Sequence, residues 1–214
     1  MSKLIIFGGG GLGLEILEYI NDLKNNKIQI AGIIDEGKKN LNSLFKIFNK
    51  KFHHYKSIEE APIDGHKYLI AVLDPTVRSK IYSILYKKNA EFFNLVHPTS
   101  YVAKTAMIGK GVIVCPFAYI GSKAKVHDNV CVSIYASVGH EASVGHSSFL
   151  GPNSSLHGNS ECGEKVFIGS QSTINVGIKI GSKSKLSYNS VLTKDCPGKS
   201  LATGIPAKFR QMYK

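Results

Sequence analysis

The sequence predicts two parts of different architecture: a small α/β domain over residues 1–92 and a parallel β-helix over residues 93–214. Three observations support this prediction. Strand and helix signals alternate up to residue 92, apolar residues then recur at every sixth position, and glycine directly follows eight of them. With 43% hydrophobic and 20% charged residues, the chain has the balance of a globular protein rather than of a disordered one.

The first part starts with the apolar run KLIIF at 3–7, which indicates a strand that ends at a glycine-rich segment. Residues 12–23 place leucine and isoleucine on one helical face, and 28–34 and 67–73 are further apolar runs. Residues 74–88 have helical spacing with a proline near the start. Because strands that alternate with helices pair in parallel through right-handed crossovers, we expect a parallel sheet covered by helices.

The second part keeps one apolar register without a slip, at Val96, Val102, Ile108, Val114, Ile120, Val126, Val132, Val138, Val144, Leu150, Leu156, Cys162, Ile168, Ile174, Ile180, Leu186 and Leu192. Such a repeat predicts a parallel β-helix, in which each hexapeptide forms a short strand and a corner and the recurring side chain points inward. Three strands close a coil of about 18 residues, so residues one coil apart stack about 4.8 Å from each other. The glycines are expected where a Cβ atom would crowd a corner. A β-sandwich is the alternative, but its strands do not keep one register for so long.

The net charge of +12, from 27 basic and 15 acidic residues, indicates an anionic partner: nucleic acid, a membrane surface or phosphorylated small molecules. No apolar run is long enough to predict an integral membrane segment, and the N-terminus lacks the features of a signal peptide. The four cysteines show no C-x-x-C or zinc spacing. We therefore expect reduced thiols in a cytoplasmic protein.

A glycine-rich loop predicts a nucleotide site in the first part. Gly8, Gly10 and Gly13 fit the dinucleotide fingerprint between a strand and a helix, and Asp35 ends the next strand. The backbone N–H groups of such a loop and the helix N-terminus favour a phosphate. Since the first part is too short for both halves of a nicotinamide-binding domain, hydride transfer is not expected.

Residues 96–197, with the closing GIPAK at 204–208, resemble a left-handed β-helix acyltransferase of the hexapeptide-repeat superfamily. With the GGGGLG domain in front, the whole chain is similar to sugar O-/N-acyltransferases of the sialic acid O-acetyltransferase type. These include bacterial N-acetyltransferases that act on nucleotide-linked 4-amino-deoxy sugars. The resemblance implies acetyl-CoA as co-substrate and a homotrimer with active sites between subunits.

The resemblance also implies binding residues. For the nucleotide sugar these are Gly8, Gly9, Gly10, Gly11, Asp35, Asp74, Pro75 and Arg78, and His157 is added because stacking puts it beside the coil position of His140. For acetyl-CoA they are Phe149, where some relatives carry a histidine near the acetyl group, and Gly158, Ile178, Lys179, Lys185, Gly204, Ile205, Pro206 and Lys208. His157 departs from the pattern, because its position is usually small in related enzymes.

His140 is the candidate general base, since imidazole suits proton abstraction from an amine at neutral pH. Glu141 follows it and is expected to orient the ring, as an acid does in the family's His-Glu or His-Asp pair. Gly158 lies one coil further on, so it should stack on His140, leave room for the thioester and offer its N–H to the oxyanion. A solvated surface histidine is the alternative. We expect His146 to be structural, and no histidine spacing predicts a metal site.

The function that these observations favour is acetyl-CoA-dependent N-acetylation of a UDP- or dTDP-linked 4-amino-4,6-dideoxy sugar, for a surface glycan such as lipopolysaccharide, O-antigen or capsule. The attack is expected to be direct, without an acyl-enzyme. One alternative is O-acetylation of a sugar hydroxyl, such as that of sialic acid. The other is a scaffold or nucleic-acid-binding protein, which the absence of a basic, aromatic-interleaved face and of a recognition helix disfavours.

The positive charge is concentrated at the end of the chain. Residues 165–214 carry nine basic groups and one acid, whereas 96–164 are neutral. This is the region where the family binds the phosphates of CoA, so the charge is explained without nucleic acid.

Overall fold

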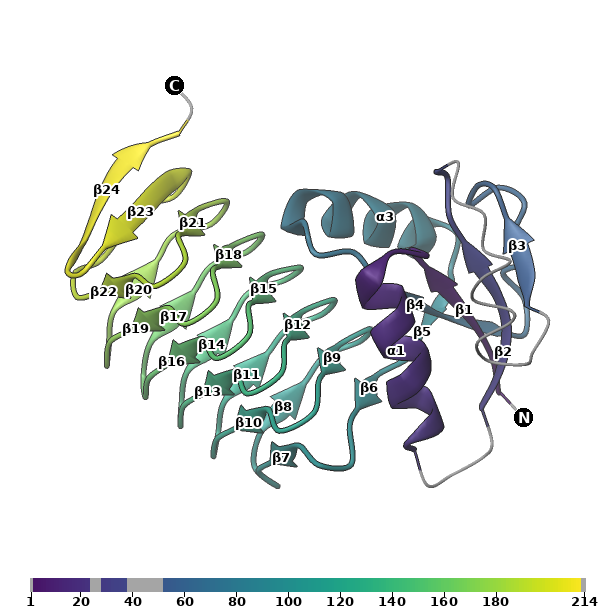
Figure 1. The fold of residues 1–214 in the computed structure, drawn as a ribbon, viewed down its shortest axis with the longest axis horizontal. Coiled ribbons are helices and arrows are strands. Elements are labelled where there is room, and N and C mark those ends of the chain that lie inside the picture. The colour runs from purple at the N-terminus through teal and green to yellow at the C-terminus, as the bar shows by residue number, and fades with distance from the viewer. Residues whose placement is uncertain (1, 24–27, 38–51, 213–214) are drawn as a thin grey trace.

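The computed structural model describes residues 2–23, 28–37 and 52–212. It shows an α/β domain followed by a three-sided β-helix, and the domain packs on one end of the prism (Figure 1). The predicted fold class, an α/β domain in front of a left-handed β-helix, is confirmed. Among the helices in the described ranges, none has the length and apolar character needed to cross a membrane.

The domain is built on five parallel strands in the order β3-β2-β1-β4-β5. Their bounds are β1 Ser2–Phe7, β2 Ile28–Ile34, β3 His53–Tyr55, β4 His66–Ile70 and β5 Glu91–Phe92. Because the chain leaves β1 toward β2 on one side and returns to β4 on the other, the carboxyl ends of β1 and β4 form a topological switch point, where ligands bind in open α/β sheets. The short β3 and β5 were not predicted, since two or three residues carry no readable period.

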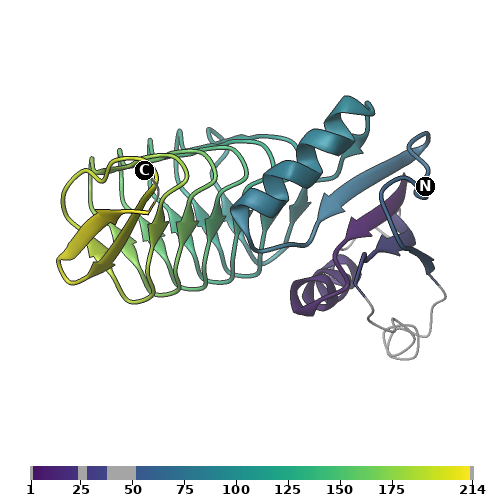
Figure 2. The same cartoon turned by 90° about the horizontal axis from the view of Figure 1, so that it is seen from above.

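Two helices cover opposite faces of this sheet. Helix α1 (Gly11–Asn21) follows β1 and packs on the face of Leu4 and Ile6, whereas α3 (Pro75–Lys87) follows β4 and packs on the face of Ile5 and Phe7. Asp74 caps α3, because its Oδ1 accepts hydrogen bonds from two N–H groups of the first turn. Helix α1 also contacts the β-helix through its apolar side and lies beside the first coils (Figures 1 and 2).

The β-helix consists of two-residue strands that stack in three parallel sheets and each end on the apolar register. The strands are β6 (Leu95–Val96), β7 (Tyr101–Val102), β8 (Met107–Ile108), β9 (Ile113–Val114), β10 (Tyr119–Ile120), β11 (Lys125–Val126), β12 (Cys131–Val132), β13 (Ser137–Val138), β14 (Ser143–Val144), β15 (Phe149–Leu150), β16 (Ser155–Leu156), β17 (Glu161–Cys162), β18 (Phe167–Ile168), β19 (Thr173–Ile174), β20 (Lys179–Ile180), β21 (Lys185–Leu186) and β22 (Val191–Leu192). Partners are eighteen residues apart, as between Ile120 and Val138. From Val102 on, the register side chains form the continuous interior core, whereas Val96 at the open end of the prism is exposed.

Glycine and left-handed backbone occupy different positions of each corner. A Cβ atom on Gly139 would lie 2.7 Å from the N atom of Gly158 on the next coil, which explains the glycines after the apolar register. Two residues later, Glu141 has a φ of 58°, and the same position is left-handed in many other corners. This conformation costs about 1–3 kcal/mol for a residue with a side chain. Here the Glu141 N–H donates to the carbonyl of Ser122, one coil back, at 2.9 Å, which helps to offset the cost.

The end of the prism departs from the eighteen-residue step. Cys196 pairs with Ile180, and Leu201 with Lys185, each only sixteen residues apart. Strands β23 (Ser200–Gly204) and β24 (Ala207–Gln211) then form an antiparallel hairpin that closes this end (Figure 1). The tip of the hairpin carries a cis Ile205–Pro206 bond.

Candidate active site

His140 lies at the corner between β13 and β14, and its side chain is 64% exposed. Its Nδ1 is 3.4 Å from Oε2 of Glu141, a long contact for a hydrogen bond. Oε1 of Glu141 is 3.5 Å from Nζ of Lys123, the residue one coil back. The contact with His140 and, next, the charge of Lys123 hold the pKa of Glu141 below its usual value. The carboxylate is therefore ionised at neutral pH and faces the Nδ1 side of the imidazole, which leaves Nε2 for a substrate.

Gly158 stacks on the imidazole of His140, as the eighteen-residue repeat predicted. A Cβ atom on Gly158 would overlap Nε2 and Cε1 of the ring, so glycine is the residue that leaves the imidazole its place. The carbonyl of His140 accepts the N–H of Asn159 at 3.0 Å, which fixes the spacing of the two coils. No acceptor among the described residues takes the N–H of Gly158. This corner thus combines an exposed imidazole and a backbone N–H donor within one strand spacing.

The other two histidines singled out from the sequence differ in their surroundings. His157 is exposed one coil above Gly139, next to the His140 corner. His146 packs edge-on against Tyr82 of α3, with ring centroids 4.8 Å apart, and burial lowers its pKa. His146 therefore belongs to the contact between the two units, in agreement with its expected structural role.

A cavity of about 470 Å³ lies at the switch point of the domain sheet. Its lining comes from the ends of β1, β2 and β4: Phe7, Gly8, Gly9, Gly10, Gly11, Leu12, Asp35, Glu36, Gly37, Ala71, Val72 and Leu73. The glycines and Asp35 were singled out from the sequence; Glu36, Gly37 and residues 71–73 were not, although each follows directly on a strand end. Asp74 and Pro75 are not in this lining and instead start α3 beside it.

Asp35 ties the walls of this cavity together. Its Oδ2 accepts the N–H of Gly9 at 2.8 Å, and its Oδ1 accepts the N–H of Gly37 at 2.8 Å. Close packing also requires the glycines, since a Cβ atom on Gly8 would lie 2.6 Å from the carbonyl oxygen of Ala71. The lining contains two carboxylates and no Lys or Arg. The N–H groups of Gly8 and Gly9 are already used by Ile34 and Asp35, so the start of α1 is the part of this lining that suits a diphosphate.

The expectation that Arg78 contacts a nucleotide is wrong. Its side chain is fully buried, and its guanidinium donates only to backbone and side-chain oxygens of the protein, at Ile70, Val72 and Asn129. Burial lowers its pKa, and no carboxylate of the described residues pairs with it. Arg78 joins the two structural units instead.

The expectation that Phe149 binds acetyl-CoA is also wrong. Phe149 is 4% exposed and packs in the cluster between α1 and the sheet of β12 and β15, a different face from the corner of His140. A second pattern in the sequence indicates that the side chain of Phe149 is covered. Outward-facing apolar residues recur every eighteen positions at Leu95, Ile113, Cys131, Phe149 and Phe167, which indicates a covered face.

The residues expected to bind CoA lie at three places in one chain. Lys179 pairs with Glu161 at 2.9 Å on the sheet that starts at the His140 corner, and Ile178 is half-buried beside it. Lys185 lies on another face, with Nζ 4.8 Å from the ring centroid of Phe167, so Lys179 and Lys185 belong to different sheets of the prism. Gly204, Ile205, Pro206 and Lys208 are exposed on the terminal hairpin.

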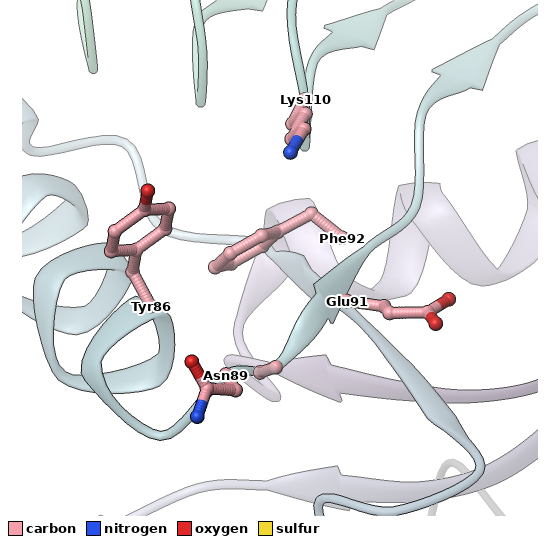
Figure 3. Close-up of a pocket in the computed structure, with 6 residues that line it drawn as sticks. Tyr86, Asn89, Glu91, Phe92 and Lys110 are labelled. Carbon is pink, nitrogen blue, oxygen red and sulfur yellow. The ribbon is translucent and has the colours of Figure 1, made fainter.

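A further cavity, of about 500 Å³, lies between the end of α3, β5 and the first coils (Figure 3). Its lining is Tyr86, Asn89, Ala90, Glu91, Phe92 and Lys110. Lys110 points toward the gap between the two aromatic rings (Figure 3). No residue singled out from the sequence lies here. In the described part of the chain, no three His, Cys, Asp or Glu residues are grouped to hold a metal ion.

Comparison with known proteins supports the resemblance stated from the sequence. Residues 3–85 match the family model of the PglD N-terminal domain. The chain is 28% identical over 120 residues to the UDP-N-acetylbacillosamine N-acetyltransferase of Bacillus subtilis (strain 168), and this match covers 53% of the chain. It spans about half, 51%, of that enzyme.

Solved structures resemble the chain over nearly its whole length. PerB from Caulobacter crescentus, in complex with CoA and GDP-perosamine, has a TM-score of 0.81 at 23% identity and covers 98% of both chains. The acetyltransferase domain of PglB from Neisseria gonorrhoeae FA1090, in complex with acetyl coenzyme A, has a TM-score of 0.86 at 23% identity, with 97% of this chain and 98% of that one covered. These likenesses establish the fold, and the predicted resemblance to sugar acyltransferases of the hexapeptide-repeat type is confirmed.

Proposed function

We propose that the protein transfers the acetyl group of acetyl-CoA to the amino group of a nucleotide-linked amino sugar. The observation that carries the proposal is the stacking of Gly158 on the exposed imidazole of His140, which gives one corner both a base and an unused backbone donor. The cavity at the glycine loop supplies a nucleotide site in the same chain. The similar proteins that are named as sugar N-acetyltransferases support this assignment.

In the proposed reaction, the sugar amine attacks the thioester carbonyl carbon and forms the N–C bond while Nε2 of His140 takes a proton from the nitrogen. The N–H of Gly158 donates to the oxyanion of the tetrahedral intermediate. When the C–S bond breaks, the imidazolium of His140 donates this proton to the departing CoA thiolate. Glu141 stabilises that cation from the Nδ1 side.

No cysteine takes part in this reaction. All four cysteines are buried, and burial raises the pKa of Cys162 to about 12. A thiol must be ionised and accessible to act as a nucleophile. Direct attack by the amine, without an acyl-enzyme, therefore agrees with the surroundings of the thiols.

We further propose that the working form is a homotrimer, with CoA bound between neighbouring prisms. Four aromatic side chains form two exposed stacks on one edge of the first coils: Tyr101 with Tyr119, centroids 5.3 Å apart, and Phe117 with Tyr135, at 5.0 Å. Exposed aromatic rings in such number are typical of interfaces. In the trimer the basic hairpin with Lys208 would hold the CoA phosphates, and His157 would contact the sugar.

For the finer identity we propose a UDP- or dTDP-linked 4-amino-4,6-dideoxy sugar, modified in the cytoplasm during synthesis of a surface glycan. O-acetylation of a sugar such as sialic acid is the second candidate, because the same base and oxyanion donor would serve a hydroxyl. The nucleotide cavity favours the first candidate, since a free sugar acid needs no such cavity.

The test is a panel of nucleotide-linked amino sugars, scored by thiol release from acetyl-CoA and by mass spectrometry. An amide product stable to hydroxylamine supports N-acetylation, whereas an ester that hydroxylamine cleaves would favour O-acetylation. His140→Ala should reduce kcat by about 10²–10⁴-fold. The matched control is His127→Ala, an exposed histidine on another corner, with wild-type kcat expected. A His140→Ala variant of undiminished activity would refute the assignment.

A further inference from the structure

We infer that Arg78 is a positioning residue that holds the wall of the nucleotide cavity in a fixed place relative to the β-helix. The kinetic part of this inference rests on the proposed function. The sequence drew attention to Arg78 as a nucleotide contact, but its burial and its partners give it this different role.

All five N–H groups of the guanidinium are used, and they divide between the two structural units. Nη1 donates to the carbonyl oxygens of Ile70 at 2.7 Å and Val72 at 2.8 Å, in the domain. The other three N–H groups go to Asn129 in the β-helix: Nε to its carbonyl oxygen at 3.1 Å, and Nη2 to that oxygen at 2.8 Å and to Oδ1 at 3.0 Å. A planar group with five directed donors fixes the distance and the orientation of what it joins.

On the domain side, Arg78 holds the backbone on both sides of Ala71, which lines the nucleotide cavity. Ala71 donates its N–H to the carbonyl of Phe7 at 2.7 Å, and its carbonyl oxygen lies against Gly8 of the loop. A shift of this backbone would therefore move the cavity wall and the glycine loop together.

On the β-helix side, Asn129 is fully buried, and its side-chain amide and its backbone N–H and carbonyl all form hydrogen bonds. Its Nδ2 donates to the carbonyl of Arg78 at 3.1 Å and to Oγ of Ser147 at 2.7 Å, and its own N–H donates to the carbonyl of Lys110 at 2.7 Å. Only strand β14 separates Ser147 from the corner of His140. The hydrogen bonds thus run from the cavity wall, through Arg78, to the coils that hold the base.

A contact that only held the two units together would not need the positive charge of Arg78. Helix α1 already joins the two units through an apolar cluster, and an apolar side chain would have closed the position of Arg78 without the cost of burying an unpaired cation. Apolar packing does not fix the orientation of one unit relative to the other, whereas directed hydrogen bonds do. For reaction, the amine of a bound sugar must lie within about 3–3.5 Å of the thioester. A fixed orientation of the domain relative to the β-helix would help to keep the amine at this distance.

The kinetic experiment compares wild type with Arg78→Met and with Arg78→Lys, whose single ammonium cannot span both units. For both variants we expect kcat/KM for the nucleotide sugar to fall at least tenfold, while KM for acetyl-CoA and the calorimetric affinity for the free nucleotide stay within twofold. Lys80→Met is the matched control, because it removes an exposed charge from the same helix and should keep all three values. If the nucleotide affinity falls by the same factor as kcat/KM, or if kcat/KM stays within twofold, the inference is overturned.

A distance measurement tests the inference without activity. Nitroxide labels at Lys56→Cys in the domain and Lys104→Cys in the β-helix are both on exposed positions, and the four native cysteines are buried. We expect one narrow distance distribution in the wild-type background and a broader one with Arg78→Met or Arg78→Lys. An unchanged width would overturn the inference. If wild type releases no thiol with any nucleotide sugar, the proposed function fails, and the label distances still decide the role of Arg78.

Discussion

Replacing Gly158 by alanine would place a methyl group where the imidazole of His140 now lies. The added carbon would be 2.5 Å from Cε1 and 3.0 Å from Cδ2 of the ring, whereas ordinary contact begins at 3.4 Å. The ring must therefore move by about 1 Å, and a displacement of this size at a reacting group can reduce the rate by about 10²-fold. This corresponds to about 2.7 kcal/mol of transition-state stabilisation.

The fold should tolerate the same change. The imidazole is 64% exposed and can turn into solvent, and the backbone of Gly158 is not left-handed. The control is Gly151→Ala at another corner, where the added carbon would lie 2.8 Å from the N atom of Ser170, which is backbone and cannot turn away. There we expect a loss of about 1–3 kcal/mol of unfolding free energy and a Tm lower by about 3–10 °C.

The assay is thiol release from acetyl-CoA at saturating sugar, together with thermal unfolding of each variant. We expect Gly158→Ala to lose activity at a nearly unchanged Tm, and Gly151→Ala to lose Tm at a nearly unchanged kcat. A Gly158→Ala variant with more than half the wild-type kcat would show that the imidazole need not occupy this place, and would refute the role of the stacked pair.

Further predictions concern cofactor binding, the thiols, pH and assembly. Lys208→Ala should raise KM for acetyl-CoA about fivefold, equivalent to about 1 kcal/mol, and Lys56→Ala should not; equal values would leave the basic hairpin without a role. The native protein should leave an aromatic disulfide reagent unreacted until it unfolds, since all four cysteines are buried; prompt colour would contradict this. Burial raises the pKa of Tyr68 from 10.0 to about 12, so its contribution is complete below pH 10 and lost as the pH rises to 12. The fall in the free energy of unfolding over that interval should be larger in wild type than in Tyr68→Phe by about 2–3 kcal/mol, and equal falls would contradict this. If the protein is the proposed trimer, Tyr119→Asp should dissociate it in sedimentation, and a trimer that stays intact would place the interface elsewhere.

The repeat made most of the β-helix predictable, because a six-residue register fixes at once which side chains point inward and which residues stack. The pairing of His140 with Gly158 followed from the same arithmetic. The strand ends that line the nucleotide cavity were only partly found, since Ala71 and its neighbours contribute backbone and small side chains that no sequence pattern marks.

The two wrong assignments have one cause. Arg78 and Phe149 both lie where the domain meets the β-helix. Each is covered by a part of the other unit that is distant in sequence: Arg78 by Asn129, and Phe149 by α1. A periodic pattern predicts contacts within its own element. It carries no information on which face another domain covers, except through a second, longer period such as the eighteen-residue recurrence of outward apolar residues.

Under the proposed mechanism, the contact between the two units serves the reaction as well as the folding of the chain. Within the β-helix, stacked backbone hydrogen bonds fix the spacing of the two coils that carry His140 and Gly158, the proposed base and the proposed oxyanion donor. In the proposed reaction the amine is not fixed in this way, because it would enter with a sugar whose nucleotide binds in the other unit. Placement of the amine then depends on the geometry of the contact that Arg78 and Asn129 maintain. A change in sugar length or ring shape can be accommodated there, while the chemistry at His140 stays the same.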